Sequence, residues 1–408
     1  MNDKIFTYIE NSKPLVLDLE TGLTSLPAIS PESGGEGEID KCVYLEGWLK
    51  AHGITNLERY DAPDSRAKGG IRPNLVATIP GKNDAKRLWI MSHLDVVPPG
   101  DMSLWNSDPW KVIEKDGKLF GRGVEDNQQG LVSSVIAALS LIDQGITPAH
   151  TVKLLFVADE ENGSEYGIDW LVKNTDLFRK DDMILVPDGG NPDGTQVVIA
   201  EKNVLWMTFH TKGIQAHGSR PDQGANASLA GSALAVHLFE GLNAHFNARD
   251  PLFEPTRSTF EPTRKEANVP NINTIPGEDH FSMDMRILPC YPIKTVLAKI
   301  DELKAEIEAK YKVTVTYSLH QSGESKGTSP DAQVVKILAK FVKDIYKVDI
   351  QAIGIGGGTV CAFLRNIDID SIVWSRMDDT AHQPNEYTII ENLLGDAKVM
   401  ALFMLEER

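Results

Sequence analysis

The stretch Val152–Ser164, VKLLFVADEENGS, places an apolar run directly before three consecutive acids, Asp159, Glu160 and Glu161. A short run rich in Val, Leu and Phe is typical of a strand that is buried on both faces of a parallel sheet. Unpaired carboxylates at the end of such a strand are costly in free energy, so folding alone gives no reason for them. We therefore predict that these acids bind a partner at the end of the strand.

Size and composition limit the classes of protein to consider. The chain has 408 residues, of which 41% are hydrophobic, enough for two domains because single cores stop growing at roughly 250–300 residues. Lys and Arg number 41 against 58 Asp and Glu, giving a net charge of −17, which disfavours binding to phosphate backbones or anionic lipid. The N-terminus lacks a secretory pattern, and the longest apolar stretch is shorter than the roughly 18 residues of a membrane span. We expect a soluble, cytoplasmic protein that binds neither nucleic acid nor membrane.

Apolar runs recur along the chain with helical patterns between them. Besides residues 152–157, strand-like runs occupy residues 88–91, 183–186 and 370–374. Before residue 152, a segment from residue 128 carries apolar side chains at helical spacing, and Gly145 is its stop signal. This alternation predicts an α/β fold, with a mainly parallel sheet covered by helices on both faces.

The pattern changes at about Trp206. From there, strand-like and helix-like segments follow in a self-contained β-α-β-β-α-β order, which is a ferredoxin-like α+β arrangement. The earlier pattern then resumes with a helix at residues 331–346 and a glycine cluster at residues 354–358. The sequence thus predicts a catalytic domain in two parts, residues 1–205 and 321–408, with an inserted domain of residues 206–320.

Side chains that commonly bind metals follow the predicted strands of the parallel sheet. In open α/β sheets the carboxyl ends of the strands form one crevice, where residues far apart in sequence meet. Two imidazoles and several carboxylates in one crevice are a ligand set for a transition metal. The predicted ligands are His93, Asp126, Glu161, Asp188 and His382.

The charges of this ligand set favour two ions. Three carboxylates against two Zn²⁺ leave one positive charge, which a bound hydroxide neutralises, whereas a single zinc leaves the carboxylates unbalanced. Asp126, between glycines and a helix start, is the predicted bridge. Such a pair of ions polarises a carbonyl group and lowers the pKa of a bound water toward 7. We predict two Zn²⁺ per subunit, with Co²⁺ or Mn²⁺ as alternatives because they accept the same ligands.

Two further acids are expected to act beside the metals. His93 and Asp95 are two residues apart in an extended segment and point to the same side, which lets Asp95 orient the imidazole. Glu160 points differently from its neighbour Glu161, so we predict that it is the general base and later returns the proton to the leaving amine.

Each of these residues also has a plain structural interpretation. The pair His93 and Asp95 can form a local hydrogen bond, Asp126 can cap a helix, and Asp188 before two glycines can belong to a turn. Their joint placement at successive strand ends is what favours a metal site.

These residues lie in motifs that resemble one family, in the order of that family and over most of the chain. It is the dinuclear zinc metallopeptidase family that includes aminoacylase, acetylornithine deacetylase, succinyl-diaminopimelate desuccinylase, glutamate carboxypeptidase and cytosolic dipeptidases. The motifs are SHLDVVPPG (92–100), GRGVED (121–126), VADEENGSEYG (157–167), AHGSRP (216–221), NINTIPGEDHFSMDMR (271–286) and AHQPNE (381–386). The resemblance implies His93 and Asp188 on one zinc, Glu161 and His382 on the other, and Asp126 bridging them.

The resemblance also implies functions for the inserted domain, as a lid that makes the contact of a homodimer. His217 matches a histidine that reaches the partner subunit's active site and stabilises the oxyanion. Asn273 and Arg286 match groups that hold the substrate carboxylate, and a guanidinium fork suits a carboxylate. Gly357, within the glycine cluster, can let backbone amides approach the same carboxylate. The alternatives are a surface ion pair for Arg286 and a structural role for His217.

Two departures from the family pattern bear on the function. Asn127, Gln128 and Gln129 stand where many relatives have methionine, lysine and glycine. Asp188 is shorter than the glutamate usual in the deacetylases, and it is similar to the dipeptidase and tripeptidase branch. We therefore predict a zinc-dependent metallopeptidase of dipeptidase or carboxypeptidase type that cleaves short peptides with a free carboxylate. The alternatives are an N-acyl-amino-acid deacylase, such as a desuccinylase or deacetylase, and a catalytically silent relative that binds peptide or metal.

Overall fold

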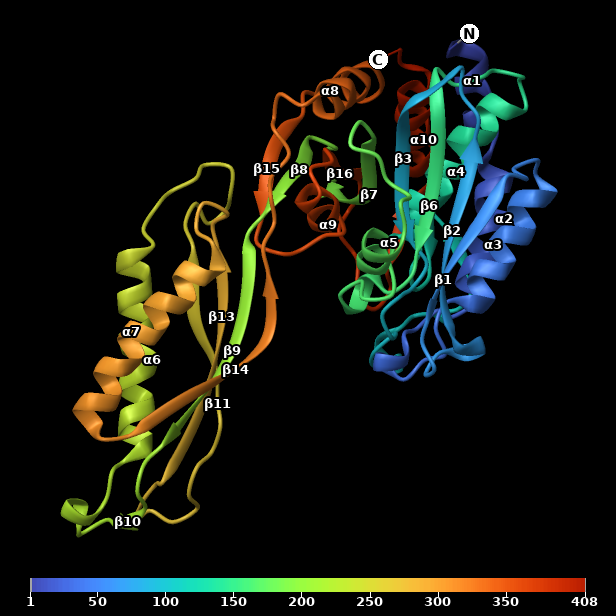
Figure 1. The fold of residues 1–408 in the computed structure, drawn as a ribbon. Coiled ribbons are helices and arrows are strands. Elements are labelled where there is room, and N and C mark those ends of the chain that lie inside the picture. The colour runs from blue at the N-terminus through green and yellow to red at the C-terminus, as the bar shows by residue number, and fades with distance from the viewer. Residues whose placement is uncertain (1, 408) are drawn as a thin grey trace. The chain divides into compact units, whose positions relative to one another are not determined.

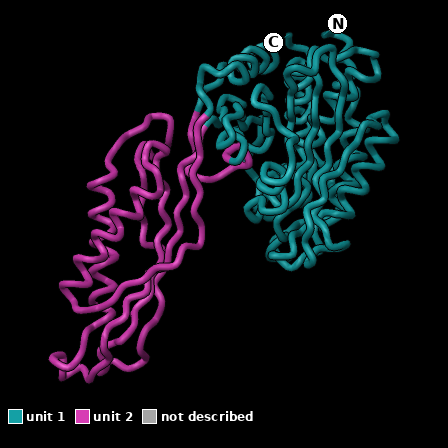
Figure 2. The backbone as a smooth tube through the Cα atoms, in the orientation of Figure 1, with its two compact units in different colours: residues 1–199, 328–352, 363–408 teal, residues 200–327, 353–362 magenta. Residues whose placement is uncertain are grey.

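The computed structural model describes residues 2–407 of the chain, which form two compact units (Figure 2). Unit 1 consists of the chain up to residue 199, residues 328–352 and residues from 363 onward. Unit 2 consists of residues 200–327 and 353–362. The glycine cluster, which the sequence analysis assigned to the second part of the catalytic domain, thus falls within unit 2. The predicted domain limits at residues 205 and 320 stay a prediction.

The main sheet has eight strands in the order β1-β2-β6-β3-β7-β16-β8-β15 (Figure 1). Its central strands β6, β3, β7 and β16 run parallel, whereas β1, β2 and β8 pair antiparallel with their neighbours. The predicted α/β fold with a mainly parallel sheet is therefore confirmed. The strands are β1 (Leu57–Pro63), β2 (Ile71–Ile79), β3 (Asn83–His93), β6 (His150–Val157), β7 (Met183–Asn191), β8 (Gln196–Glu201), β15 (Gln351–Ile355) and β16 (Ser371–Arg376).

Helices pack against this sheet, and the most deeply buried is α4 (Gln128–Ile142). Almost all of its side chains are buried because it contacts β3, β7 and β6 on one side and other helices elsewhere. A helix that is apolar all round is expected in such a position. The other helices of this part of the chain are α1 (Asn2–Glu10), α2 (Lys13–Thr24), α3 (Ile39–Ala51), α5 (Ile168–Asn174), α8 (Gln333–Tyr346), α9 (Cys361–Asn366) and α10 (Ile390–Leu405).

A small sheet with the order β17-β5-β4 joins two loops that are far apart in sequence. Its strands are β4 (Ile113–Lys115), β5 (Lys118–Phe120) and β17 (Tyr387–Ile389). The pairing of β17 with β5 brings the chain just after His382 beside the chain just before Asp126.

Unit 2 is built on a four-stranded antiparallel sheet in the order β11-β13-β9-β14, with α6 and α7 packed on one face (Figure 1). Alternate residues of β13, from Phe281 to Ile287, are buried in the core of this unit. The elements follow as β9 (Asn203–Lys212), α6 (Ala227–His245), β11 (Thr259–Lys265), β13 (Glu278–Ile287), α7 (Ile293–Tyr311) and β14 (Thr314–Gly323). A two-stranded ribbon of β10 (Ala216–His217) and β12 (Thr274–Ile275) extends the unit.

None of the helices within residues 2–407 is both long and apolar enough to cross a lipid bilayer.

Candidate metal centre

The five predicted ligands come from separate loops and strand ends of unit 1. His93 is the last residue of β3, and Asp188 lies on the parallel neighbour β7. Asp126 lies in the turn before α4. Glu161 belongs to a 3₁₀ turn, Glu160–Asn162, that follows β6, and His382 lies in the loop between β16 and β17. The carboxyl ends of parallel strands thus converge, as expected for an open α/β sheet.

Three of these side chains form the His93 position, which we define as His93, Asp126 and Asp188. The Nε2 atom of His93 lies 2.8 Å from Oδ1 of Asp126 and 3.7 Å from Oδ1 of Asp188. The imidazole is deeply buried, since only 2% of the side chain is exposed.

The His382 position is the second group, which we define as Asp126, Glu161 and His382. The Nε2 atom of His382 lies 3.0 Å from Oδ2 of Asp126 and 3.0 Å from Oε2 of Glu161. The two positions share Asp126, which turns one carboxylate oxygen to each imidazole. This arrangement suits a carboxylate that bridges two ions.

The hydrogen bonds of His93 show that its Nε2 atom is suited to a cation. Its other nitrogen, Nδ1, lies 2.9 Å from the backbone carbonyl oxygen of Asp95. A carbonyl oxygen only accepts, so Nδ1 carries a proton; Nε2 then holds a second proton against two carboxylates, and its lone pair would repel them if that proton left. A cation between these groups relieves that repulsion. The Oε1 atom of Glu161 is also buried and has no hydrogen-bond partner among the described residues. The residues present therefore fit a pair of divalent ions.

The pKa shifts have the same electrostatic origin. Burial lowers the pKa of His93, but the charge of Asp188 and the hydrogen bond with Asp126 outweigh it, so this pKa lies well above its ordinary value. Hydrogen bonds to Asp126 and Glu161 raise the pKa of His382 to about 10. Burial raises the pKa of Asp188. Protons on the two imidazoles thus balance the carboxylates, and a divalent cation competes with each proton for the same nitrogen.

Asp95 contacts both the His93 ring and the turn that carries Glu160 and Glu161. Its carboxylate is 3.5 Å from Nδ1 of His93, so the closer contact with the ring comes from its backbone carbonyl. The carboxylate instead accepts the backbone N–H of Glu160 at 3.1 Å and that of Glu161 at 3.0 Å. The side chain of Asp95 therefore fixes the turn that carries both glutamates.

The three acids that follow β6 have different surroundings. Asp159 turns away from the centre and forms an ion pair with Arg72 at 3.1 Å, while it also accepts the backbone N–H of Tyr166. Glu160 lines a cavity of about 270 Å³ beside the ligands, together with Gly189 and Gly190. Burial, and then the charge of Asp188, raise the pKa of Glu160 well above its ordinary value.

The substrate-binding residues predicted from the inserted domain fall into two groups within unit 2. His217 and Asn273 are neighbours on the β10–β12 ribbon, where the backbone N–H of Gly218 donates to the carbonyl oxygen of Asn273 at 2.7 Å. Both side chains are exposed, and Nδ1 of His217 lies 2.8 Å from the hydroxyl of Ser219.

Arg286 lies near the end of β13, next to its last residue, Ile287, and is held by neighbours within unit 2. Its guanidinium forms two hydrogen bonds with Asp284, at 2.7 and 3.0 Å, and donates to the carbonyl oxygen of Gly356 at 2.8 Å. It also lies over the ring of Trp206. The predicted Gly357 directly follows the residue that Arg286 contacts. The ion pair considered as an alternative for Arg286 is thus present in the structure.

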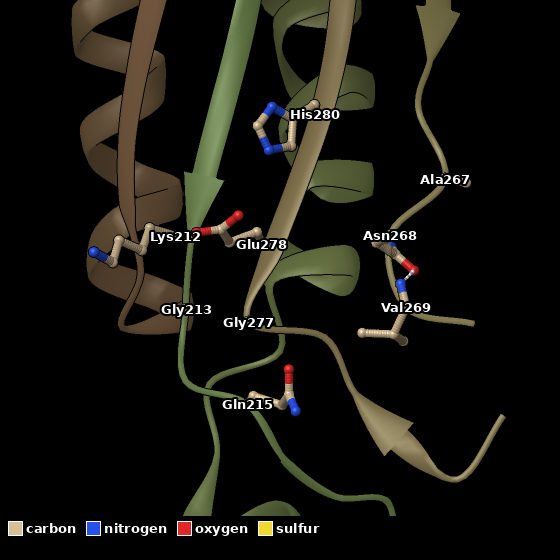
Figure 3. Close-up of a pocket in the computed structure, with 9 residues that line it drawn as sticks. All are labelled: Lys212, Gly213, Gln215, Ala267, Asn268, Val269, Gly277, Glu278 and His280. Carbon is tan, nitrogen blue, oxygen red and sulfur yellow. Dashed lines mark hydrogen bonds between the residues drawn. The ribbon is translucent and has the colours of Figure 1, made fainter. Parts of the chain in front are cut away.

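A separate cavity of about 410 Å³ lies in unit 2, where β9 ends and β13 begins (Figure 3). Lys212, Glu278 and His280 line it, and Gln215 leads from it to the β10–β12 ribbon. The residues that line this cavity include none of the predicted site residues.

Two carboxylates that hold the loops of the centre were not predicted from the sequence. Glu125 and Glu386 are buried. Glu125 accepts a backbone N–H group from the loop that carries His382. Glu386 accepts backbone N–H groups from the loop that carries Asp126. Glu386 lies in the motif AHQPNE, and Glu125 directly precedes Asp126, but neither residue type at these places signals a backbone contact.

Comparisons with known proteins give the family. The model of peptidase family M20/M25/M40 matches residues 89–406. An uncharacterized metallohydrolase of Methanococcus maripaludis is 41% identical over 405 residues, which cover 94% of this chain and 97% of that protein. A succinyl-diaminopimelate desuccinylase of Nautilia profundicola is 25% identical, with 93% of this chain and 97% of that protein covered. The solved structure of aminopeptidase PepT from Bacillus cereus has a TM-score of 0.75 at 18% identity, over 96% of this chain and 97% of that one. The chain therefore belongs to peptidase family M20/M25/M40 and is a metal-dependent hydrolase.

Proposed function

We propose that this protein is a dizinc peptidase that cleaves short peptides with a free C-terminal carboxylate. The observation that carries the proposal is the pair of three-residue groups that share Asp126, one oxygen of which faces each imidazole. Two zinc ions held there would polarise the scissile carbonyl and lower the pKa of a water between them. The ligands would be His93, Asp126, Glu161, Asp188 and His382.

Glu160 is the proposed general base. It lines the cavity beside the ligands, and its pKa is raised by burial and by Asp188. A carboxylate with a raised pKa accepts a proton from the attacking water and returns it to the leaving amine more readily near neutral pH. The Asp95 carboxylate fixes the backbone of Glu160, which keeps this base in place.

Recognition of the substrate carboxylate is assigned to Asn273, Arg286 and Gly357. The support is chemical, because the Arg286 fork suits a carboxylate and carries more N–H groups than Asp284 and Gly356 use. His217 is the proposed donor to the oxyanion, because its exposed ring on the ribbon is free to reach a second subunit.

A homodimer through unit 2 belongs to the same proposal. The outer side of α6 exposes three apolar side chains at helical spacing, Leu229, Val236 and Phe239. Apolar side chains that line one helix face are common at contacts between subunits. Mixing a Glu160→Gln subunit with a His217→Ala subunit should restore part of the lost activity if each active site draws on both chains. No recovery in the mixed dimer would contradict the contribution of His217 across the interface.

A cytoplasmic location fits the cysteines. Cys42 and Cys290 are free thiols, and Cys290 is exposed. Free thiols suit a reducing compartment.

The choice of peptidase over deacylase rests on Asp188. An aspartate at this position resembles the dipeptidase and tripeptidase branch, whereas the deacetylases usually have the longer glutamate. The second candidate is an N-acyl-amino-acid deacylase, which the similarity to a desuccinylase favours. A turnover screen of the metal-loaded protein against dipeptides, tripeptides, and N-acetyl and N-succinyl amino acids separates these two activities. Turnover of only the acylated amino acids would overturn the choice of peptidase.

A catalytically silent relative is the third candidate, and Glu160 distinguishes it. Glu160→Gln should lower kcat by about 10²–10⁴-fold, the usual contribution of a general base, while two ions stay bound. Glu165→Gln, which changes an exposed acid in the same loop, is the matched control and should keep full activity. A fully active Glu160→Gln protein would refute the assignment of the base, and an inactive wild-type protein with two ions bound would support the silent relative.

A further inference from the structure

The two residues that flank Asp126 in the sequence are both buried and polar. Glu125 is 2% exposed and Asn127 is 1% exposed. Neither belongs to the predicted ligand set, and Asn127 is one of the departures from the family pattern. Their side chains contact different parts of the centre.

Glu125 contacts the loop that carries His382. One carboxylate oxygen accepts the backbone N–H of Asp378 at 2.9 Å, and the other accepts both the backbone N–H and the hydroxyl of Thr380, the latter at 2.7 Å. These contacts end two residues before His382. Hydrogen bonds from several donors to one buried carboxylate are strong and fix the geometry of the donors.

His382 itself stands in an exposed and conformationally unusual place, so contacts nearby in its loop matter for its position. Its side chain is 55% exposed, and the backbone at His382 has a φ of 62°, in the left-handed region that non-glycine residues seldom adopt. Glu386 adds the reverse contact, since it accepts the backbone N–H groups of Gly123, Glu125 and Asp126 at 3.0 to 3.1 Å. The loops of Asp126 and His382 are thus tied to each other from both sides.

Asn127 contacts the other half of the centre. Its Nδ2 atom donates to Oδ1 of Asp188 at 2.6 Å and to the carbonyl oxygen of Pro187 at 2.7 Å. A side chain without a donor at this place, such as the methionine of many relatives, cannot make either bond. The two bonds together fix the rotation of the Asp188 carboxylate relative to its own backbone.

We propose that Glu125 and Asn127 are positioning residues that each serve one half of the centre. Glu125 secures the His382 position through the loop at residues 378–380, and Asn127 secures the His93 position through Asp188. The inference rests on the proposed function, because it requires that each position hold an ion. Removing a group that orients a metal ligand typically lowers the metal affinity by about 10–100-fold.

The test is a Co²⁺ titration of the metal-free protein, followed by absorption spectroscopy and by elemental analysis after dialysis. The variants are Asn127→Leu, which keeps the size of the side chain and removes the donor, and Glu125→Gln, which keeps the shape and replaces one accepting oxygen by a donor. His93→Ala and His382→Ala supply reference spectra for protein that lacks one position. Ser133→Ala is the matched control, because Ser133 is a buried polar residue of α4 that donates only to the carbonyl oxygen of Leu393.

Asn127→Leu should weaken one ion by about 10–100-fold and leave a spectrum like that of His93→Ala. Glu125→Gln should weaken the other ion and leave a spectrum like that of His382→Ala. The control should bind both ions as the wild type does. Wild-type affinity for both ions in the two variants, or an equal loss of both ions in each, would overturn the inference.

Two further results keep the outcomes separable. If Glu125→Gln fails to fold, Thr380→Val removes one of the three contacts and should shift the same ion in the same direction by a smaller factor. Wild-type protein that binds fewer than two ions would refute the proposed function itself. Two ions in the wild type with unaffected variants would refute only the positioning roles.

Discussion

The two halves of the candidate metal centre are built in different ways. At the His93 position, His93 and Asp188 lie on neighbouring parallel strands, and the imidazole is buried. At the His382 position, Glu161 lies in a 3₁₀ turn and His382 in a loop with a half-exposed side chain. A strand fixes its side chains through the hydrogen bonds of the sheet, whereas a loop needs specific contacts to do the same.

The difference implies that the His93 position is preformed and that the His382 position depends on its surroundings. Buried carboxylates supply those surroundings, since Glu125 and Glu386 hold the loops and Asp95 holds the turn of Glu161. An ion at the His382 position should therefore bind with the lower affinity of the two, and a chelator should remove it first.

The largest effect is expected from Asp126, because both positions share it. Asp126→Ala removes one oxygen from each position and leaves the imidazoles without their common partner. We expect loss of both ions and of several kcal/mol of transition-state stabilisation, or about 10³-fold or more in kcat. Elemental analysis and steady-state kinetics check this. Retention of one tightly bound ion would show that the two positions are independent of the bridge.

The two histidines should differ in what their loss does to the fold. His93→Ala leaves a cavity and two partly buried carboxylates without their imidazole, so we expect loss of one ion together with destabilisation of about 2–4 kcal/mol. His382→Ala removes a half-exposed ring and should lose one ion with little change in the stability of the metal-free protein. Chemical denaturation of the metal-free variants measures this, and an equal destabilisation by both changes would remove the distinction between the two positions.

The His93 position, which is built on strands, could be predicted from the sequence for a physical reason. Apolar runs of fixed length mark the strands, and the parallel sheet brings their carboxyl ends together, so His93 and Asp188 follow from local patterns. The predicted β-α-β-β-α-β order counts a strand before β13 without giving its residues; this strand is β11, whose pattern Pro262 interrupts at an edge position with an irregular register.

Contacts that depend on loop conformation left little trace in the sequence. The Asp95 side chain was expected beside the His93 ring and lies 3.5 Å from it, but alternation along a strand does not reveal that the backbone carbonyl of Asp95 makes a closer contact. Glu125 beside Asp126 gives no pattern of its own, because its partners at residues 378–380 lie far along the chain. Such contacts are set by tertiary structure alone.

Asp95 offers a sharper test of the comparison. Because the closer of its two ring contacts is made by the backbone, Asp95→Asn should leave that His93 contact in place and weaken the bonds to the N–H groups of Glu160 and Glu161. We expect a loss of about 10–100-fold in affinity for the ion at the His382 position, together with a lower kcat through Glu160. Competition with a graded chelator series measures the affinity. A selective loss at the His93 position would instead indicate that the carboxylate orients the ring.

The smallest effect concerns pH and the metal-free protein. Because the folded-state pKa of His382 is raised to about 10, its contribution to stability is complete below pH 6.5, the ordinary value for histidine, and is lost as the pH rises toward 10. A bound ion replaces the proton on that nitrogen, so the gain in Tm on adding Zn²⁺ should grow over the same pH range. The effect is modest because the side chain is half exposed and solvent screens it. Thermal denaturation with and without Zn²⁺ measures the gain, and His382→Ala should flatten its pH dependence. A gain that falls as the pH rises would contradict the assignment of His382 as a ligand that exchanges its proton for a metal ion.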